Sequence, residues 1–332
     1  MPVSLVTGGA GFMGAHLVKE LLNMGHTVVA LDDLSGGFRD QVDPRATFVQ
    51  GSINDYALVD ALFAEHRFDH VYHLAAYAAE GLSHFIRGFN YQNNLIGSIH
   101  LINASVRHKV KCFVFTSSIA VYGALHPPMR EDMQPRPEDP YGVAKYAVEL
   151  DLYAARHMFG LNYVVFRPHN VYGEYQNIGD RYRNVVGIFM NQLMQGIPLS
   201  VFGDGLQQRA FSYVGDIAPV MARCVDVPAA YGEVFNIGAD TPYTVLQLAE
   251  AVMEAMGVKG EVKHVEARNE VVHAWSDHGK LERVFGPQPS TPLVEGLTRM
   301  AEWAKRTGAR QSKSFGHIEI TEKLPPFWVQ QG

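Results

Sequence analysis

The sequence predicts an α/β protein in which a doubly wound parallel sheet is followed by a smaller C-terminal lobe. From the first residue, short β-branched runs alternate with helical patterns, and this alternation is typical of a parallel sheet with crossover helices. The runs are uniformly apolar, as strands must be when helices cover both faces of a sheet. With 332 residues, 47% of them hydrophobic, the chain is long enough to fill such a core.

The expected strands follow one another through the first half of the chain. They are "VSLVTG" (3–8), "TVVALDD" (27–33), "ATFVQG" (46–51), "HVYHLAA" (70–76), "CFVFTSS" (112–118) and "NYVVFRP" (162–168), with a helix ending at Met24 between the first two. After Pro168 the sequence turns polar in "GEYQNIGDRYRN", and "FNIG" (235–238) later predicts one more buried strand. We therefore assign residues 1–170 and about 210–238 to the sheet domain, and about 171–209 and 239–332 to the lobe.

Composition and charge exclude several classes of function. The net charge is −6 and the Lys and Arg residues are scattered, so we expect no nucleic-acid partner. The only cysteines, Cys112 and Cys224, lie in different apolar segments, which argues for a reducing compartment and buried thiols rather than a disulfide. The first residues fit neither a signal peptide nor a membrane span, and no HExxH pattern occurs. We therefore expect a cytoplasmic protein with no membrane partner and no metal.

The stretch "TGGAGFMG" places Gly8, Gly11 and Gly14 between the first strand and the first helix, at the spacing GxxGxxG. Glycines there allow a tight turn and bring the backbone close to a pyrophosphate, which the helix N-terminus stabilises. The second strand ends at Asp32, where a carboxylate accepts hydrogen bonds from an adenosine ribose, whereas the adjacent Asp33 is expected to be solvated. Because an acid at this place repels a ribose 2′-phosphate, the pattern favours NAD over NADP as the cofactor.

The stretch "EDPYGVAKYAVEL" (138–150) predicts a helix with two reactive side chains on one face. Asp139 is a suitable N-cap and Pro140 a suitable first helical residue, because a proline there gives up only an amide that would be unpaired. Tyr141 and Lys145 are four residues apart, so the phenol and the ammonium can point at one ligand. Such pairs are also common on solvated helix surfaces, and the helix alone does not decide between these interpretations.

With "TGGAGFMG", "VYHLAA", "FVFTSSIAVYG" and "YGVAK" in this order, nearly the whole chain resembles the extended short-chain dehydrogenase/reductase family, in particular its nucleotide-sugar 4-epimerases. The resemblance implies a Rossmann fold and a catalytic group of Ser118, Tyr141 and Lys145, with Thr116 and Ser117 on the cofactor side. Tyr141 would take the proton of a sugar hydroxyl while a hydride leaves the same carbon for NAD, and Ser118 would hold the oxygen.

This role requires a phenolate near neutral pH. Lowering the pKa of a phenol by about three units needs roughly 4 kcal/mol of preferential stabilisation of the charged form. Lys145 and the positively charged nicotinamide ring are the expected sources. The ketone formed would then rotate and be reduced on its other face, so that the cofactor is regenerated in each cycle.

The resemblance also implies which residues hold the cofactor. Ile53 would present its backbone to the adenine, and Asn94 would brace the site. The full set expected around NAD is Gly8, Gly11, Phe12, Met13, Gly14, Asp32, Ser52, Ile53, Leu74, Ala75, Ala76, Asn94, Thr116, Tyr141, Lys145 and Pro168. Two positions depart from the family pattern: Ser52 replaces an Asp that usually contacts adenine, and Ala78 replaces a Lys of the bacterial epimerases.

The segments "RPHNVYG" and "VFGDGLQQRAFSYVGDIA" match the family's substrate segments. The resemblance implies that the diphosphate and base of the substrate are held by Ser118, Asn170, Asn184, Ser200, Phe202, Arg209 and Arg268. An Arg suits a diphosphate because its planar fork binds two phosphate oxygens at once. A surface ion pair is the alternative for Arg209. Arg181 and Arg183 are either solvated or reach a charged substituent of the sugar.

Several related activities compete with 4-epimerisation of UDP-glucose and UDP-galactose. Dehydratases and decarboxylases of the family carry an acidic residue directly after the catalytic Ser or Thr, whereas Ile119 and Ala120 stand there in this chain. A nucleotide-sugar ketoreductase, an epimerase of UDP-glucuronate or another nucleotide sugar, and a non-catalytic dinucleotide sensor remain alternatives. A sensor would typically lack the Tyr or the Lys.

A homodimer is expected from the apolar spacing of two helices. One contains "NNLIGSIHLINAS" (93–105), and the other begins at Tyr141. The alternative is that both apolar stripes face the protein's own sheet.

Overall fold

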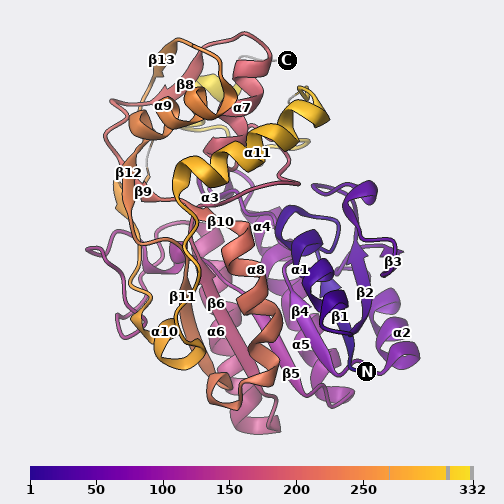
Figure 1. The fold of residues 1–332 in the computed structure, drawn as a ribbon. Coiled ribbons are helices and arrows are strands. Elements are labelled where there is room, and N and C mark those ends of the chain that lie inside the picture. Colours follow the sequence, from indigo (N-terminus) through magenta and orange to yellow (C-terminus); the bar gives the residue numbers. More distant parts are fainter. Residues whose placement is uncertain (269, 312–314, 330–332) are drawn as a thin grey trace.

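The computed structural model describes residues 1–268, 270–311 and 315–329. Seven parallel strands form the central sheet, in the order β11-β6-β5-β4-β1-β2-β3 (Figure 1). Their bounds are β1 Val3–Thr7, β2 Thr27–Asp32, β3 Thr47–Gln50, β4 His70–His73, β5 Cys112–Thr116, β6 Tyr163–Pro168 and β11 Glu233–Ile237. The doubly wound parallel sheet predicted from the sequence is confirmed, and the expected strand in "FNIG" is its edge strand β11.

Helices cover both faces of the sheet. Side chains of β1 alternate, so that Val6 packs with one set of helices and Leu5 with the other. The first face carries α1 (Phe12–Asn23) and α8 (Val214–Arg223), which pack against each other. The second face carries α2 (Tyr56–His66), α5 (Gly97–Arg107) and α6 (Pro140–Phe159). Cys112 and Cys224 are buried free thiols, as expected.

The lobe is built from short strands and three longer helices. Its strand pairs are β13 (Val262–Val265) with β8 (Leu199–Phe202), β9 (Gln208–Ala210) between β12 (Pro242–Thr244) and β14 (His273–Ala274), and β7 (Val171–Tyr172) with β10 (Ser212–Tyr213). Its helices are α7 (Val185–Met194), α9 (Val245–Met256) and α11 (Leu293–Thr307). Short helices elsewhere are α3 (Glu80–Ser83), α4 (Arg87–Tyr91), α10 (Gly279–Phe285) and α12 (Pro326–Val329), and single turns lie at Arg39–Gln41, Gln92–Ile96, Ile119–Tyr122, Cys224–Asp226 and Pro228–Ala230.

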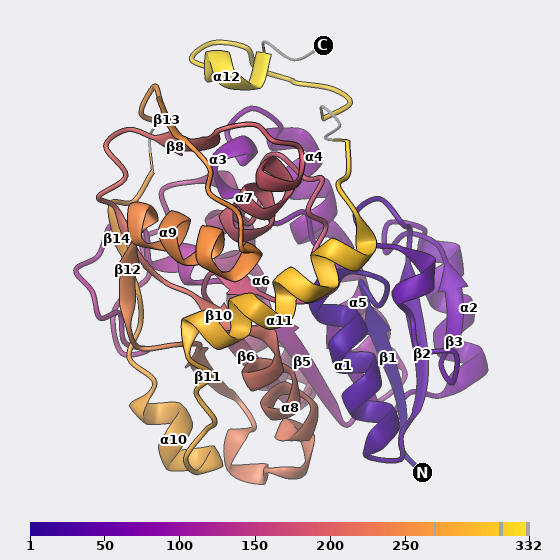
Figure 2. The same cartoon turned by 45° about the horizontal axis from the view of Figure 1, so that its top comes forward.

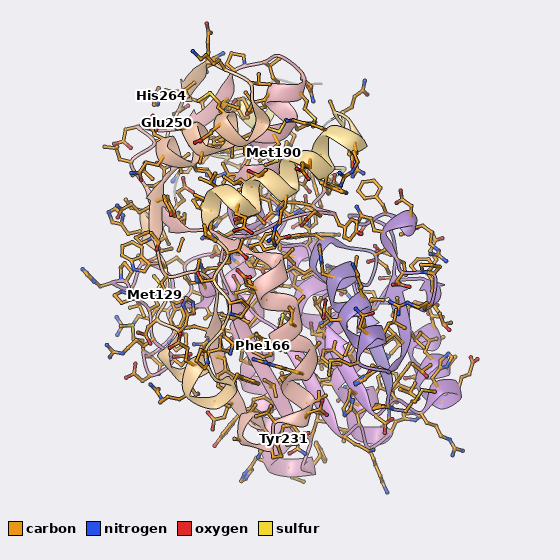
Figure 3. All side chains as sticks on the ribbon, in the orientation of Figure 1. Met129, Phe166, Met190, Tyr231, Glu250 and His264 are labelled. Carbon is orange, nitrogen blue, oxygen red and sulfur yellow. The ribbon has the colours of Figure 1, made fainter. Side chains whose placement is uncertain are left out.

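One hydrophobic core is shared by the lobe and the first face of the sheet. Phe166 of β6 and Met190 of α7, both labelled in Figure 3, belong to the same buried cluster. Met300 of α11 joins them from the lobe. Helix α10 falls in the range that we assigned to the lobe, but it packs on the sheet, because the Phe285 ring lies 5.2 Å from the Phe235 ring of β11. The lobe is therefore held against the sheet by packed side chains.

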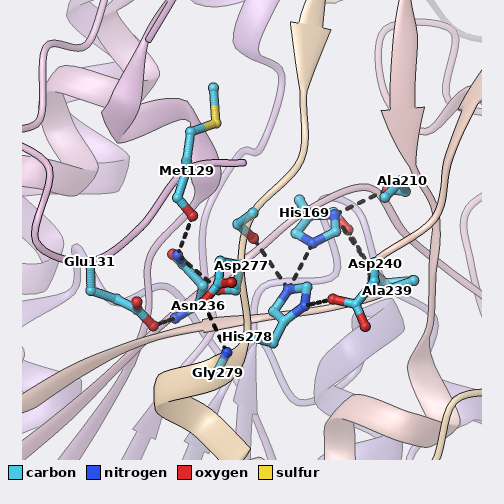
Figure 4. A network of polar contacts seen from close by, with 12 residues as sticks. Met129, Glu131, His169, Ala210, Asn236, Ala239, Asp240, Asp277, His278 and Gly279 are labelled. Atoms are coloured by element: carbon cyan, nitrogen blue, oxygen red, sulfur yellow. Dashed lines mark hydrogen bonds and ion pairs between the residues drawn. The ribbon is translucent and has the colours of Figure 1, made fainter. Parts of the chain in front are cut away.

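A polar network fixes the chain where it passes between sheet and lobe (Figure 4). His169 follows β6, Asp240 follows β11, and His278 lies just before α10. His169 Nε2 is 3.2 Å from His278 Nε2, and His278 Nδ1 is 2.6 Å from Asp240 Oδ1. The Asn236 amide of β11 donates to the carbonyl oxygen of Met129 at 3.0 Å. Buried polar groups are thus paired at this crossing, which holds the residues after β6 in place.

The C-terminal segment returns to the sheet domain. In Figure 2 it extends from the end of α11 to α12, at the end of the molecule opposite the N-terminus. Trp328 packs edge-on to Phe85 and Tyr182, and Glu319 accepts hydrogen bonds from two first-turn amides of α4, those of Gly88 and Phe89. Among the residues that the structure describes, no helix combines the length and apolar character needed to cross a membrane.

Candidate active site

A cavity of about 1190 Å³ lies where the strands of the sheet end against the lobe. Residues that directly follow β1, β2, β4, β5 and β6 all line it. The carboxyl ends of parallel strands are where such sheets bind ligands, because the loops there diverge from a common edge. All the predicted site residues line this cavity with one exception, Asn94.

The glycine loop forms the turn that a pyrophosphate requires. Gly8 has φ +72°, and a side chain there would approach the backbone nitrogen of Ala75 to 2.8 Å. A side chain at Gly14 would overlap the carbonyl oxygen of Gly8. Gly11 is the N-cap of α1 and offers no capping side chain, so the first-turn amides remain available to an anion. Phe12 and Met13 line the cavity beside them. This loop fits a dinucleotide.

Asp32 is fixed at the end of β2 with its carboxylate toward the cavity. Its Oδ2 accepts from the amide of Ala10 at 3.0 Å and its Oδ1 from the amide of Leu34 at 2.8 Å. Burial raises the pKa of Asp32, and these backbone hydrogen bonds oppose the rise. Each carboxylate oxygen keeps acceptor capacity for a ribose hydroxyl. Asp33 is exposed and its side chain accepts from Ser35, so Asp32 is the better candidate.

Replacing Asp32 by Ala should weaken NAD binding by about 10- to 100-fold, because hydrogen bonds to a charged acceptor are lost. Titration of NAD into the purified variant, followed calorimetrically, measures the change. Asp33→Ala removes the same charge from the neighbouring exposed residue and should bind NAD almost as the wild type does. Unchanged binding in Asp32→Ala would show that the ribose contact lies elsewhere.

Tyr141 and Lys145 share the buried face of α6. The helix begins as predicted: the Asp139 carboxylate accepts from the Gly142 amide at 2.8 Å, and Pro140 is in the first turn. Tyr141 is 7% exposed and Lys145 2%. Lys145 Nζ lies 5.7 Å from the centre of the Tyr141 ring and donates to the carbonyl oxygen of Thr116 at 2.8 Å. The pair faces the cavity, so the solvated-surface interpretation is wrong.

Burial acts on the protonation of both groups. It raises the pKa of Tyr141, and a hydrogen bond with Ser118 opposes this rise. It lowers the pKa of Lys145 to about 7, against the charge of Glu149. A positive charge beside the phenol would lower its pKa again, since opposite charges favour the ionised form. The protein groups alone therefore hold Tyr141 in its neutral form.

A buried ionic network lies behind Lys145, and sequence reasoning missed it. Arg167 donates to both carboxylate oxygens of Glu149, at 3.0 and 2.5 Å, and to the Tyr122 hydroxyl at 2.8 Å. Ser117 lies beside the cavity, but its hydroxyl donates to Glu149 at 2.5 Å. The only sequence signal was an acid four residues after Lys145, on the same helix face. The network orients the helix that carries the reactive pair.

The remaining cofactor-side residues line the cavity, except Asn94, which lies behind its wall. Ser52, Ile53, Leu74, Ala75, Ala76, Thr116 and Pro168 all lie on its wall. The Thr116 hydroxyl is buried without a hydrogen-bond partner among the described residues, as a ligand contact would require. Asn94 is buried instead: it accepts from the Tyr77 amide at 2.8 Å and donates to the Tyr77 carbonyl at 3.1 Å. Its amide is fully used in shaping the loop after β4.

Two arginines gather at the other end of the cavity. Arg209 lies 3.6 Å from Glu270, and Arg268 donates to the same carboxylate at 3.0 Å. The guanidinium of Arg268 is 4.5 Å above the Phe202 ring, whose edge meets Phe327. Arg209 is largely buried, so its ion pair is not the surface pair that we considered. The cations and the aromatic face suit a phosphate and a base.

The other predicted substrate residues lie around these arginines. Asn170, Asn184 and Ser200 line the cavity, and the Ser200 hydroxyl accepts from Gln192 at 3.0 Å. Asn184 precedes α7 and has φ +60°, a conformation that an asparagine tolerates better than most residues.

Neither arginine of the polar segment after β7 is solvated. Arg181 donates to the carbonyl oxygen of Phe327 at 2.8 Å and does not line the cavity. Arg183 lines it, pairs with Asp180 at 2.6 Å and lies 4.6 Å from the centre of the Tyr77 ring. Only Arg183 of the two is therefore placed to approach a ligand.

Comparison with known proteins points to one family. The sequence model of the NAD dependent epimerase/dehydratase family matches residues 4–238. The UDP-glucose 4-epimerase of Mycolicibacterium smegmatis is 33% identical over 90% of this chain and 97% of that protein. The structure of UDP-glucose 4-epimerase from Thermotoga maritima with UDP-glucose has a TM-score of 0.88 at 34% identity, covering 92% of this chain and 99% of that one. The complex of the Thermus thermophilus UDP-glucose 4-epimerase with NAD has a TM-score of 0.86 at 31% identity, covering 91% and 98%.

Proposed function

The chain belongs to the NAD dependent epimerase/dehydratase family, and from this premise we propose that it inverts C4 of a nucleotide-diphosphate sugar, UDP-glucose and UDP-galactose being the preferred pair. NAD is its cofactor. The observation that carries the proposal is the pair of Tyr141 and Lys145, buried on one helix face beside the cavity, with Ser118 on the same cavity wall. The names of similar proteins support the choice of UDP-glucose.

The residues divide the reaction between them. NAD, when bound, would supply the redox chemistry at this carbon, as acceptor and then donor of a hydride. Tyr141 takes the proton of the C4 hydroxyl and later gives it back, while Ser118 holds the oxygen. Lys145 and the oxidised cofactor provide the positive charge that the phenolate needs. The diphosphate stays on Arg209 and Arg268 while the 4-keto sugar turns.

The related activities fit the site less well. Ile119 and Ala120 occupy the positions where dehydratases and decarboxylases of the resembled family carry an acid, and neither side chain transfers a proton. A ketoreductase using NADPH would place a 2′-phosphate against the buried carboxylate of Asp32. A sensor without activity has no need for the buried pair of Tyr141 and Lys145.

Incubation of the purified protein with a panel of nucleotide sugars tests the proposal. The panel contains UDP-glucose, UDP-galactose, UDP-glucuronate, UDP-N-acetylglucosamine and a GDP- and a dTDP-sugar, and chromatography resolves the products. We expect the C4 epimer to form with no added reduced cofactor, on protein that already carries NAD. Stoichiometric consumption of NADH would indicate a reductase, a deoxy product a dehydratase, and no turnover a sensor.

We also propose a homodimer built on α5 and α6. The inner side of α6 packs on the sheet through Val148 and Leu152, yet its outer side exposes Leu150 by 53% and Tyr153 by 65%. Val143 continues this exposed stripe at helical spacing. Two apolar stripes of this kind can cover each other across a two-fold axis.

Light scattering at about micromolar concentration, the range in which specific interfaces of standard size persist, should give the mass of a dimer for the wild type. Leu150→Arg should give a monomer, because a charge would enter the apolar contact. Val258→Arg changes an exposed valine of the lobe in the same way and should remain dimeric. A monomeric wild type would contradict the proposed interface.

A further inference from the structure

The cavity contains a carboxylate that neither the sequence motifs nor the proposed reaction uses. Glu80 is the first residue of α3, four positions beyond Ala76 at the end of the loop segment "HLAA", and it lines the cavity. Within the described residues its carboxylate makes no hydrogen bond and no ion pair. Only its backbone oxygen is bonded, by the Ser83 hydroxyl at 2.6 Å. The side chain is exposed and opens into the cavity.

Glu80 lies between the two ends of the proposed substrate. On one side, the Tyr141 amide donates to the Ser83 hydroxyl at 3.2 Å, which ties α3 to the first turn of α6. On the other side, a side chain at Gly81 would lie 3.9 Å from Nη1 of Arg268. Glu80 therefore stands on the wall between the proposed proton-transfer group and the proposed diphosphate site. A sugar that spans these two must pass it.

The charges around Glu80 agree with this placement. Burial raises the pKa of Glu80 to about 7, and the negative charges of Asp139 and Glu270 act in the same direction. The positive charges of Arg209 and Arg268 oppose the rise. The Glu80 carboxyl therefore interacts electrostatically with both the start of α6 and the arginine pair.

We propose that Glu80 contacts the sugar of the bound nucleotide sugar and restricts it to a neutral hexose, its carboxylate accepting hydrogen bonds from sugar hydroxyls and repelling the carboxylate of a hexuronate. This inference rests on the proposed function and names the substrate class of the same site. An unpaired carboxylate in a partly enclosed space gains from hydroxyl donors, whereas a second carboxylate beside it costs free energy.

The arginines of the cavity wall already have partners of their own, so they offset this repulsion only in part. Arg209 and Arg268 share Glu270 and are assigned to the diphosphate. Arg183 is paired with Asp180. Arg310 lies 3.7 Å above the ring of Phe38, a residue bonded to the glycine loop at the cofactor end of the cavity. The site therefore discriminates against a hexuronate through charge repulsion by Glu80, and it favours a neutral hexose through hydrogen bonds from its hydroxyls to Glu80.

The test measures how NAD-loaded protein binds UDP-glucose and UDP-glucuronate by calorimetry, with UDP as the reference. The wild type should bind UDP-glucose tighter by about 10- to 100-fold. Glu80→Gln keeps the shape but removes the charge and should reduce this preference by about tenfold, with UDP binding unchanged. Glu80→Asp keeps the charge and should retain the preference. Glu138→Gln removes another acid of the cavity wall, one that packs toward Gly123, and should also retain it.

The pH dependence gives a readout that a merely structural role would not produce. Protonation removes the charge of Glu80, so the preference of the wild type for UDP-glucose should grow as the pH rises through about 7. The preference in Glu80→Gln should change less over the same range, since the titration of Lys145 remains there. An equal affinity of the wild type for both sugars, or an unchanged preference in Glu80→Gln, overturns the inference.

The outcomes also separate this inference from the proposed function. If both sugars bind with the expected preference but neither is converted, the proposed epimerisation fails and the role of Glu80 stands. If the wild type converts both sugars with equal kcat/KM and affinity, epimerisation stands and the role of Glu80 fails. If UDP binds but neither UDP-sugar binds or is converted, both fail.

Discussion

Tyr141→Phe is expected to lower turnover of the nucleotide sugar by about 10²- to 10⁴-fold while NAD and UDP bind nearly as before. The change deletes one oxygen atom. The helix keeps its cap, because Asp139 bonds the amide of Gly142 and not the phenol. The glycine loop and Arg209 lie elsewhere on the cavity wall. Rates with saturating UDP-glucose, or with the best substrate of the panel, measure the loss.

Lys145→Met separates a proton-transfer role from a packing role. Its activity should also fall, because the pKa of Tyr141 rises when a nearby positive charge is removed. More of the phenol ionises at alkaline pH, so Lys145→Met should recover part of its activity there. Tyr141→Phe should not recover. If Tyr141→Phe kept wild-type turnover, Tyr141 would have no part in the reaction, and the assignment of this site would have to be given up.

Arg167→Met should lower the free energy of unfolding by about 3–5 kcal/mol, because it leaves the carboxylate of Glu149 buried without its cation. The side chains of Arg167 and Glu149 are only 4% and 5% exposed. The guanidinium also lies 4.8 Å from the centre of the Tyr122 ring, so packing is lost together with charge. Urea denaturation followed by far-UV circular dichroism measures the change.

A double variant is the control for this prediction. Arg167→Met with Glu149→Leu removes both charges and should recover most of the lost stability, since a buried ion pair is often replaceable by apolar residues of similar volume. A loss below about 1 kcal/mol in Arg167→Met alone would show that Glu149 finds another partner or takes up a proton.

The parts of the fold that the sequence predicted depend on neighbours in the chain. A strand, Gly8 and a helix follow one another within the first 23 residues, so the phosphate-binding turn is a local pattern. The placing of Asp32 needs only that β2 pairs in parallel with β1. The N-cap of α6 likewise follows from adjacent residues. Each of these features required no knowledge of distant contacts.

The parts that were missed depend on residues far apart in the sequence. Arg181 is bonded to Phe327, and the two are 146 positions apart, so no local pattern shows that this arginine is unavailable. The Asn94 side chain hydrogen-bonds the backbone of Tyr77, whereas the sequence motif shows only that Asn94 belongs to a cofactor site. Glu80 follows the strand-end segment as one acid among many, and only the arrangement of α3 against α6 reveals it. Long-range packing decides such roles.

The shared core of sheet and lobe has a thermodynamic consequence. The sheet domain and the lobe bury side chains in one common core. Neither part can unfold alone without exposing that core to water. Moving the lobe away from the sheet to open the cavity would therefore require a free energy similar to that of unfolding a large part of the molecule. A ligand that contacts only the lobe therefore also stabilises the sheet domain, because its binding shifts the unfolding equilibrium of a single cooperative unit.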